Sequence, residues 1–139
     1  MANQTLILTV GLPRSGKTTW ARQQGHPIVN PDSIRLALHG QRFQLEAEPM
    51  VWAIARYMVK ALFLAGHHTV ILDATNTTEM RRREWNDRDW VTVLHVVPTS
   101  RDECVRRALD QDDLYIVPVI DRMAAQIEWP AHSGAPEGQ

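Results

Sequence analysis

The stretch that decides the fold is LILTVGLPRSGKTTWARQQ, residues 6–24. Its first part, residues 6–10, is a run of aliphatic and β-branched residues, which is typical of a buried strand. Residues 11–18 fit the pattern G-x-x-x-x-G-K-[ST], and the residues that follow have helical spacing. A glycine-rich loop between a strand and a helix lets backbone N–H groups converge on a phosphate at the helix N-terminus. The stretch therefore predicts a nucleoside triphosphate site.

Two side chains of this loop have specific roles in the predicted site. Lys17 can reach the β- and γ-phosphates, and the hydroxyl of Thr18 can bind Mg²⁺. We therefore expect ATP as the phosphoryl donor and Mg²⁺ as the cofactor. The residues expected around the donor phosphates are Gly11, Leu12, Pro13, Arg14, Ser15, Gly16, Lys17, Thr18 and Thr19.

Length and composition are those of a single globular domain. The chain has 139 residues, of which 44% are hydrophobic. It contains no uncharged apolar window of about 18 residues, so we expect no membrane span. The single cysteine, Cys104, allows neither an internal disulfide nor a cysteine metal cluster, which favours a cytoplasmic location, in a host cell if the protein is viral. A net charge of −1 excludes a global attraction to nucleic acid, although arginines gather within residues 81–88 and 101–107.

Strand-like and helix-like segments alternate along the chain. The expected strands cover residues 6–10, 28–29, 69–72 and 91–97. The first expected helix begins at residue 17, and the others cover residues 31–38, 50–65, 78–85, 100–109 and 118–127. This order favours an α/β fold, in which a parallel sheet is covered by helices on both faces. We expect one domain, residues 1–129, and a disordered tail, residues 130–139. In such sheets ligands bind at the carboxyl ends of the strands.

The segment NPDSIR, residues 30–35, follows the second expected strand. Asp32 and Arg35 are three residues apart in the first turn of a helix and share a face. A carboxylate there can accept the proton of an attacking hydroxyl, and an arginine can bind an acceptor phosphate. The alternative is an acid favoured by the helix dipole, with a surface salt bridge to the arginine.

The segment TVILDATNTTEMRRREW, residues 69–85, carries the third group of candidates. Asp73 ends an apolar strand, where P-loop enzymes place the acid of the Mg²⁺ shell. Thr75 and Asn76 can bind substrate or only shape the turn. The arginines that follow either contact the acceptor or form a solvated helix face.

Taken in order, the segments GLPRSGKTTWA, NPDSIR, VILDATNTTEMRRREW and HVVPTSRDECVRRAL resemble the polynucleotide-kinase family of P-loop phosphotransferases over roughly residues 5–127. The phage T4 kinase domain and small phage 5-hydroxymethyluracil DNA kinases represent the family. The resemblance implies a P-loop NTPase fold of the nucleoside or polynucleotide kinase type. It makes Asp32 the general base, Arg35 an acceptor contact, and Arg107 a lid residue at the donor phosphates, with Arg106 as the alternative one position away.

The motifs and the family resemblance together predict three groups of site residues. The catalytic residues are Asp32, Lys17, Arg35 and Arg107; the metal ligands are Thr18 and Asp73; the acceptor-binding residues are Arg35, Thr75, Asn76, Arg82 and Arg83. One departure from the family is the absence of a second lid arginine about four residues after the first, because Gln111 stands there. An arginine in such a role is worth about 10³–10⁵ in rate in related chemistry. Either the role is vacant or another residue fills it, with Arg14 as the candidate.

These residues predict an ATP-dependent phosphotransferase that moves the γ-phosphate to a nucleic-acid hydroxyl, with DNA favoured. The acceptor is either the hydroxymethyl group of 5-hydroxymethyluracil or a 5′-OH end. A small-molecule kinase and a non-catalytic nucleotide-binding module are the alternatives. Among the tryptophans, Trp85 and Trp90 are the candidates for contact with DNA, whereas Trp20 and Trp52 are expected to pack between helices and sheet.

Overall fold

A four-stranded parallel sheet forms the centre of the computed structural model, which describes residues 3–131. In the order β2-β3-β1-β4, the strands are Ile28–Val29, Thr69–Leu72, Thr5–Val10 and Val91–Val96. Parallel pairing joins β1 to both β3 and β4, and β3 to β2. The predicted α/β class is confirmed. The expected tail, residues 130–139, lies outside the described residues from position 132 onward.

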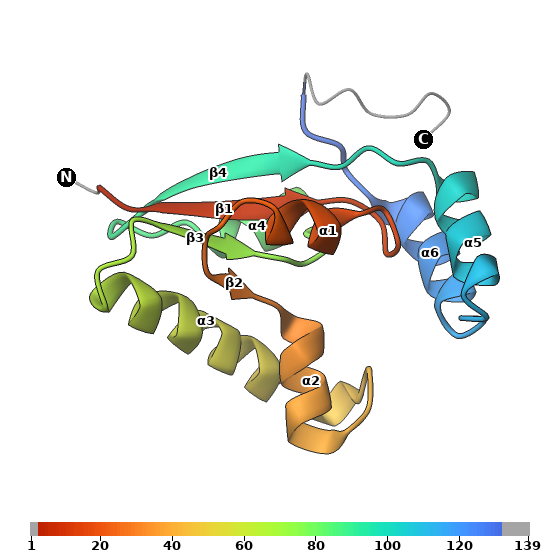
Figure 1. The fold of residues 1–139 in the computed structure, drawn as a ribbon, viewed down its shortest axis with the longest axis horizontal. Coiled ribbons are helices and arrows are strands. Elements are labelled where there is room, and N and C mark those ends of the chain that lie inside the picture. The colour runs from red at the N-terminus through yellow and green to blue at the C-terminus, as the bar shows by residue number, and fades with distance from the viewer. Residues whose placement is uncertain (1–2, 132–139) are drawn as a thin grey trace.

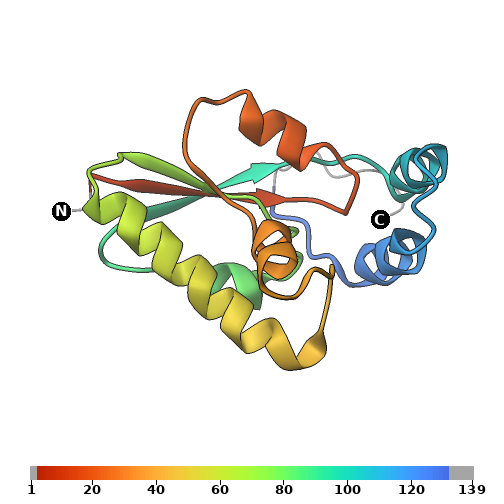
Figure 2. The same cartoon turned by 60° about the horizontal axis from the view of Figure 1, so that its bottom comes forward.

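Helices lie on both faces of this sheet and beyond one end of it. The helices are α1 (Lys17–Arg22), α2 (Pro31–His39), the 3-10 helix η1 (Leu45–Ala47), α3 (Glu48–Leu64), α4 (Glu79–Arg83), α5 (Arg101–Asp110) and α6 (Ile116–Gln126). Figure 2 shows α1 on one side of the sheet and α3 with α4 on the other. In Figure 1, α5 and α6 lie side by side past the carboxyl ends of β1 and β4, and we call this pair the lid. Within residues 3–131, none of the helices combines the length and apolarity needed to cross a bilayer.

Helix α3 covers the sheet with one row of side chains. Val51, Ala55, Val59 and Phe63 recur every four residues and are buried against the sheet. Helical spacing in the expected helix 50–65 predicts that one buried face contains Val51, Ile54, Ala55, Met58, Leu62 and Ala65. In the structure 39% of the Met58 surface is exposed. The prediction was wrong by one position because the row that begins at Val51 and Ala55 continues through Val59 and Phe63.

Local capping signals were informative about where helices begin. The Asn30 side chain accepts a hydrogen bond from Asp32 N at 2.8 Å, with Pro31 as the first helical residue. The Ser100 side chain likewise accepts from Glu103 N at 3.2 Å and begins α5. Both predicted helix starts are confirmed. Residues 41–48 are polar and lie between the expected helices 31–38 and 50–65, which predicts a loop. In the structure this segment instead contains η1 and the first residue of α3.

A second, smaller core joins the phosphate loop to the lid. Leu12 of the loop, Cys104 and Ala108 of α5, and Ile120 of α6 are buried together. Burial raises the pKa of the Cys104 thiol, so this cysteine serves as an apolar core residue. Because the loop and the lid share this core, a displacement of the lid would disturb the packing of the phosphate loop.

Substitution of Gly11 tests how closely the segments that follow the strands approach one another. A Cβ at Gly11 would lie 2.7 Å from the Val97 carbonyl oxygen and 2.9 Å from Ser15 Oγ. We expect Gly11→Ala to lower the free energy of unfolding by about 1–3 kcal/mol, measured by urea denaturation, because backbone must move to admit the methyl group. Gly25→Ala is the control, since its φ of +75° imposes backbone strain but no atom lies within 4 Å. A smaller loss in Gly11→Ala than in Gly25→Ala would contradict this account.

Candidate active site

A cleft of about 1150 Å³ opens at the carboxyl ends of the strands, between the lid and the helices α2 and α3. Its walls come from the phosphate loop, α2, α3, the segment after β3 and the lid. The sequence-predicted site residues that line the cleft are Pro13, Arg14, Ser15, Gly16, Lys17, Thr18, Thr19, Asp32, Arg35, Asp73, Thr75, Asn76 and Arg107. The fold therefore brings most of the predicted site together.

The phosphate loop is a tight turn that holds Lys17 close to its own backbone. Arg14 and Gly16 have positive φ angles of 67° and 104°, which curl the loop. Lys17 Nζ donates to the Leu12 carbonyl oxygen at 2.6 Å and to Ser15 Oγ at 3.3 Å. Burial lowers the pKa of Lys17 to about 8, although the nearby carboxylate of Asp73 acts in the opposite direction. A phosphate bound by the loop would offer this ammonium a negative partner in place of two neutral acceptors.

Thr18 and Asp73 meet at the end of β3. Thr18 Oγ1 donates to Asp73 Oδ2 at 2.6 Å, and Asn30 Nδ2 donates to the same oxygen at 3.1 Å. Mg²⁺ in nucleotide sites is bound by one or two protein oxygens together with phosphates and water. In the described part of the chain, no three His, Cys, Asp or Glu side chains gather as a metal cage. A hydroxyl beside a buried carboxylate fits a magnesium ion shared with a nucleotide.

Asp32 and Arg35 lie at the N-terminal end of α2, opposite the phosphate loop. Arg35 Nη1 donates to Asp32 Oδ1 at 2.7 Å, while Arg35 Nε and Nη2 bind the two Glu48 carboxylate oxygens at 2.9 and 2.6 Å. The Asp32 side chain is 73% exposed, whereas that of Glu48 is 14% exposed. Hydrogen bonds from Arg35 lower the pKa of the Glu48 carboxyl group. Glu48 therefore fixes the position of the Arg35 guanidinium, and the Asp32 carboxylate remains exposed to the cleft.

Glu48 escaped the sequence analysis because it was assigned to the polar loop before α3. Three of the five N–H groups of Arg35 are engaged by Glu48 and Asp32, and the rest can still donate to an acceptor.

The residues after β3 divide between the cleft wall and the support of the turn. Asn76, at φ +44°, is buried and donates through Nδ2 to the Thr9 carbonyl oxygen at 2.8 Å. Arg82 is also buried, and its guanidinium donates to the carbonyl oxygens of Asn76 and Glu128 at 2.8 Å each. Arg83 is paired with Glu79 on the exposed side of α4. Asn76 and Arg82 thus brace the turn.

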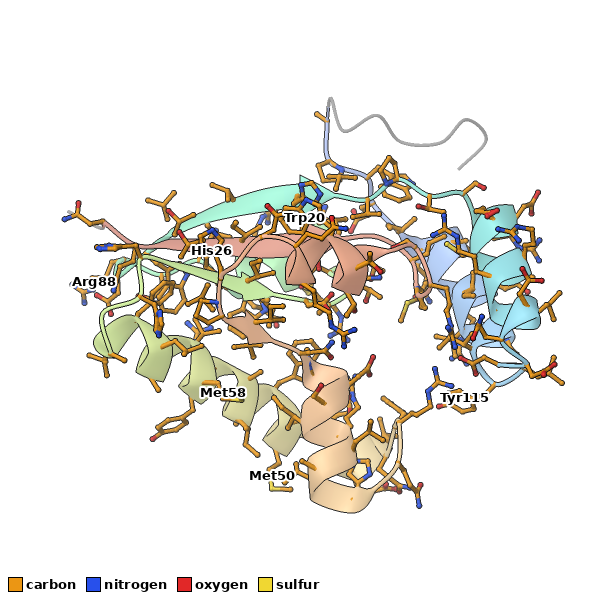
Figure 3. All side chains as sticks on the ribbon, in the orientation of Figure 1. Trp20, His26, Met50, Met58, Arg88 and Tyr115 are labelled. Atoms are coloured by element: carbon orange, nitrogen blue, oxygen red, sulfur yellow. The ribbon has the colours of Figure 1, made fainter. Side chains whose placement is uncertain are left out.

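A neighbouring arginine, Arg81, lines the cleft, as do Trp52, Phe43 and Arg56 of the wall beside α3. Trp90 is 3% exposed, and its ring nitrogen donates to the Trp85 carbonyl oxygen, so it belongs to the core. Trp20 lies between α1 and β4 (Figure 3), where its ring stacks on that of His95, in agreement with the expected packing between helix and sheet. Trp52 was not predicted to line the cleft, because its position in the helix indicated packing against the sheet.

In the lid, the structure places Arg107 and not Arg106 at the phosphate loop. Arg107 Nη1 donates to the Arg14 carbonyl oxygen at 3.2 Å. Arg106 instead pairs with Glu103 and Asp110 on the exposed side of α5.

Asp113, between the two lid helices, connects three parts of the cleft. It accepts from Arg14 of the phosphate loop at 2.7 Å and from both terminal nitrogens of Arg42, after α2, at 2.6 and 2.9 Å. The pKa of Asp113 falls to about 2, chiefly through its hydrogen bonds with Arg42 and then with Arg14. The Arg42 guanidinium lies over the Tyr115 ring, 5.0 Å from its centre. Figure 3 shows Tyr115 projecting from the lid toward the loop after α2.

Comparisons with known proteins agree with this geometry. A chain of the Pnkp1/Rnl/Hen1 RNA repair complex has a TM-score of 0.69 and 20% identity over 91% of this chain and 44% of its own. A second structure of the Pnkp1/Rnl/Hen1 complex gives 0.66 and 27%, over 75% of this chain and 38% of its own. This chain therefore spans less than half the length of these two relatives. A gluconokinase from Sinorhizobium meliloti gives 0.56 and 17%, over 96% and 81%. No curated protein matches.

The parallel sheet, the phosphate loop and the acid after β3 define a P-loop protein with a kinase-like fold. The chain belongs to the family described as AAA domain, whose model matches residues 6–128. The fold shared with chains of the Pnkp1/Rnl/Hen1 complex agrees with the P-loop kinase resemblance stated from the sequence motifs.

The hydrogen bonds from Arg14 and Arg42 to Asp113 tie the lid to the rest of the cleft, and this tie predicts how the lid responds to pH. A carboxyl group with a lowered pKa stabilises the folded state above its ordinary pKa of about 4, and this contribution is lost as pH falls toward the folded value. We expect amide exchange in residues 111–117, measured relative to the intrinsic exchange rate at each pH, to stay slow down to about pH 4 and to accelerate toward pH 2. Asp113→Asn should accelerate it at neutral pH, whereas Asp112→Asn, beside it but outside the tie, should not. Equal exchange in the two variants would show that Asp113 does not hold the lid.

Proposed function

We propose that the protein is an ATP-dependent phosphotransferase that moves the γ-phosphate of ATP to a hydroxyl of a nucleic acid. The observation that carries the proposal is the exposed carboxylate of Asp32, held by Arg35 in the same cleft as Lys17 and Thr18. A nucleotide-binding module without catalysis has no need of a fixed carboxylate opposite its phosphate loop.

The transfer uses these residues in a simple order. The acceptor hydroxyl approaches Asp32, which accepts its proton as the oxygen bonds to the γ-phosphorus. The bond from that phosphorus to the β-phosphate oxygen breaks, and ADP leaves. Lys17 and Arg107 neutralise charge on the donor phosphates. When bound by Thr18 and Asp73, Mg²⁺ would supply further charge neutralisation.

The wall beside α3 supports a nucleic-acid acceptor. Trp52 and Phe43 offer aromatic surface at the cleft, and Arg35, Arg56 and Arg81 offer positive charge. Aromatic rings that stack on unpaired bases, with arginines for the backbone, are typical of single-strand recognition. The likeness to chains from an RNA repair complex favours a 5′-OH end over an internal hydroxymethylated base. The gluconokinase shares the fold alone.

Replacement of Asp32 tests the catalytic assignment. We expect Asp32→Asn to lower the single-turnover rate by about 10²–10⁴, because the amide cannot accept the proton, while ATP affinity is unchanged. The amide oxygen can still accept from Arg35, so the cleft should keep its shape. Asp89→Asn, an exposed acid outside the cleft, is the control. A fall in ATP affinity with unchanged chemistry would make Asp32 part of the nucleotide site instead.

The acceptor is tested with labelled ATP and a matched set of substrates. The set contains DNA and RNA oligonucleotides with a 5′-OH, the same oligonucleotides with a 5′-phosphate, a 5′-phosphorylated DNA with internal 5-hydroxymethyluracil, and gluconate. We expect label on the 5′-OH oligonucleotides, with transfer weakening as salt rises. Lys17→Ala sets the background. Label only on the modified base would give a base kinase, and label only on gluconate would overturn the nucleic-acid proposal.

A further inference from the structure

Arg42 enters the cleft from the wall opposite the phosphate loop. It follows α2, which ends at Gly40 with a φ of +69°, and crosses to the lid, where both its terminal nitrogens bind Asp113. Its side chain is 45% exposed and lines the same cleft as Lys17 and Asp32. No local sequence pattern indicates a role for this residue.

Two positively charged side chains bind the single negative charge of Asp113. Arg14 Nη2 lies 2.7 Å and Arg42 Nη2 lies 2.9 Å from the same Asp113 oxygen, so two guanidinium groups share one carboxylate. The surplus positive charge lies beside the phosphate loop, where Arg107 also contacts the Arg14 backbone. A second anion that presents two oxygens to a guanidinium group would be attracted to this point, and a terminal phosphate group can do so.

Arg42 also lies within electrostatic reach of the catalytic acid. Its pKa is raised, chiefly by the hydrogen bonds to Asp113 and in smaller part by the charges of Asp113 and Asp32. The Arg42 guanidinium binds the lid carboxylate and lines the same cleft as the carboxylate of Asp32. In a transfer reaction the γ-phosphorus lies between the phosphate loop and the acceptor hydroxyl, which is the same region of the cleft.

We propose that Arg42 is a catalytic residue that exchanges Asp113 for the γ-phosphate of ATP and neutralises its oxygens during transfer. The inference rests on the proposed phosphotransferase function. Arg42 forms no bond to phosphorus and moves no proton: the proton goes to Asp32, and ADP leaves as before. Arg14 remains with Asp113, so the lid stays tied while Arg42 is engaged. The arginine comes from the acceptor wall, whereas the lid carries Gln111 within the same cleft.

The competing explanation is that Arg42 only ties the loop after α2 to the lid. The two explanations differ in what Asp113→Asn does, because this change weakens the tie but leaves the guanidinium in place. If Arg42 acts on phosphate, Asp113→Asn keeps the transfer rate within about tenfold of wild type. If Arg42 is only a tie, Asp113→Asn and Arg42→Ala have the same effect.

The experiment measures ATP and ADP affinity with Mg²⁺, and the single-turnover rate, in wild type, Arg42→Ala, Arg42→Lys, Asp113→Asn and Arg88→Ala. Arg88 lies far from the lid, beyond the opposite end of the sheet (Figure 3), and controls for loss of a surface charge. We expect Arg42→Ala to lower the transfer rate by about 10²–10⁴ and to weaken ATP binding more than ADP binding. Arg42→Lys should recover part of both losses, and Arg88→Ala should match wild type.

Two results would overturn the inference. One is equal loss of ATP and ADP affinity in Arg42→Ala. The other is a transfer rate in Arg42→Ala no lower than in Asp113→Asn. Unfolding midpoints of all variants identify any loss that comes from instability. If wild type labels no acceptor, the proposed function fails by itself, and the ratio of ATP to ADP affinity in Arg42→Ala still decides whether Arg42 contacts the γ-phosphate.

Discussion

The close approach of three backbone segments at Gly11 is the constraint on which the cleft depends. Gly11 N donates to the Thr75 carbonyl oxygen at 3.1 Å, and the Val97 carbonyl oxygen lies where a side chain would begin. These contacts join the segments that follow β1, β3 and β4. Thr99 Oγ1 adds a hydrogen bond to the Ser15 carbonyl oxygen at 2.8 Å. Because these loops are fixed to one another, Thr18 and Asp73 are held within hydrogen-bonding distance of each other.

The part of the site that sequence could predict is the part that local structure sets. The phosphate loop, the Asn30 cap and Asp73 at the end of β3 each depend on a strand or helix boundary within a few residues. Glu48 and Arg42 gain their roles from contacts 13 and 71 residues apart in sequence, with Arg35 and Asp113. No local sequence pattern indicates which loops cross the mouth of a cleft, so these two roles could be recognised only in the folded structure.

Predictions of which side of a helix is buried failed for a related reason. Periodicity indicated that α3 is amphipathic, but the angle at which a helix crosses the sheet also decides which of its side chains are buried. Met58 lies outside the buried row. The arginine run after β3 illustrates the same limit. Arg81 lines the cleft, Arg82 supports the turn, and Arg83 faces outward, although the three are adjacent in sequence and alike in charge.

The acids of the cleft explain how a chain of net charge −1 can receive a polyanion. Arg14, Arg35 and Arg42 are paired with carboxylates before a ligand arrives, which fixes their side chains and reduces the entropy lost when they bind phosphate. The two acids beside Arg35 differ in what they can do next. Glu48 is mostly buried and binds the guanidinium through both oxygens, so it holds position; Asp32 uses one oxygen and leaves the other to the cleft. This division lets one acid supply rigidity and the other remain available for proton transfer.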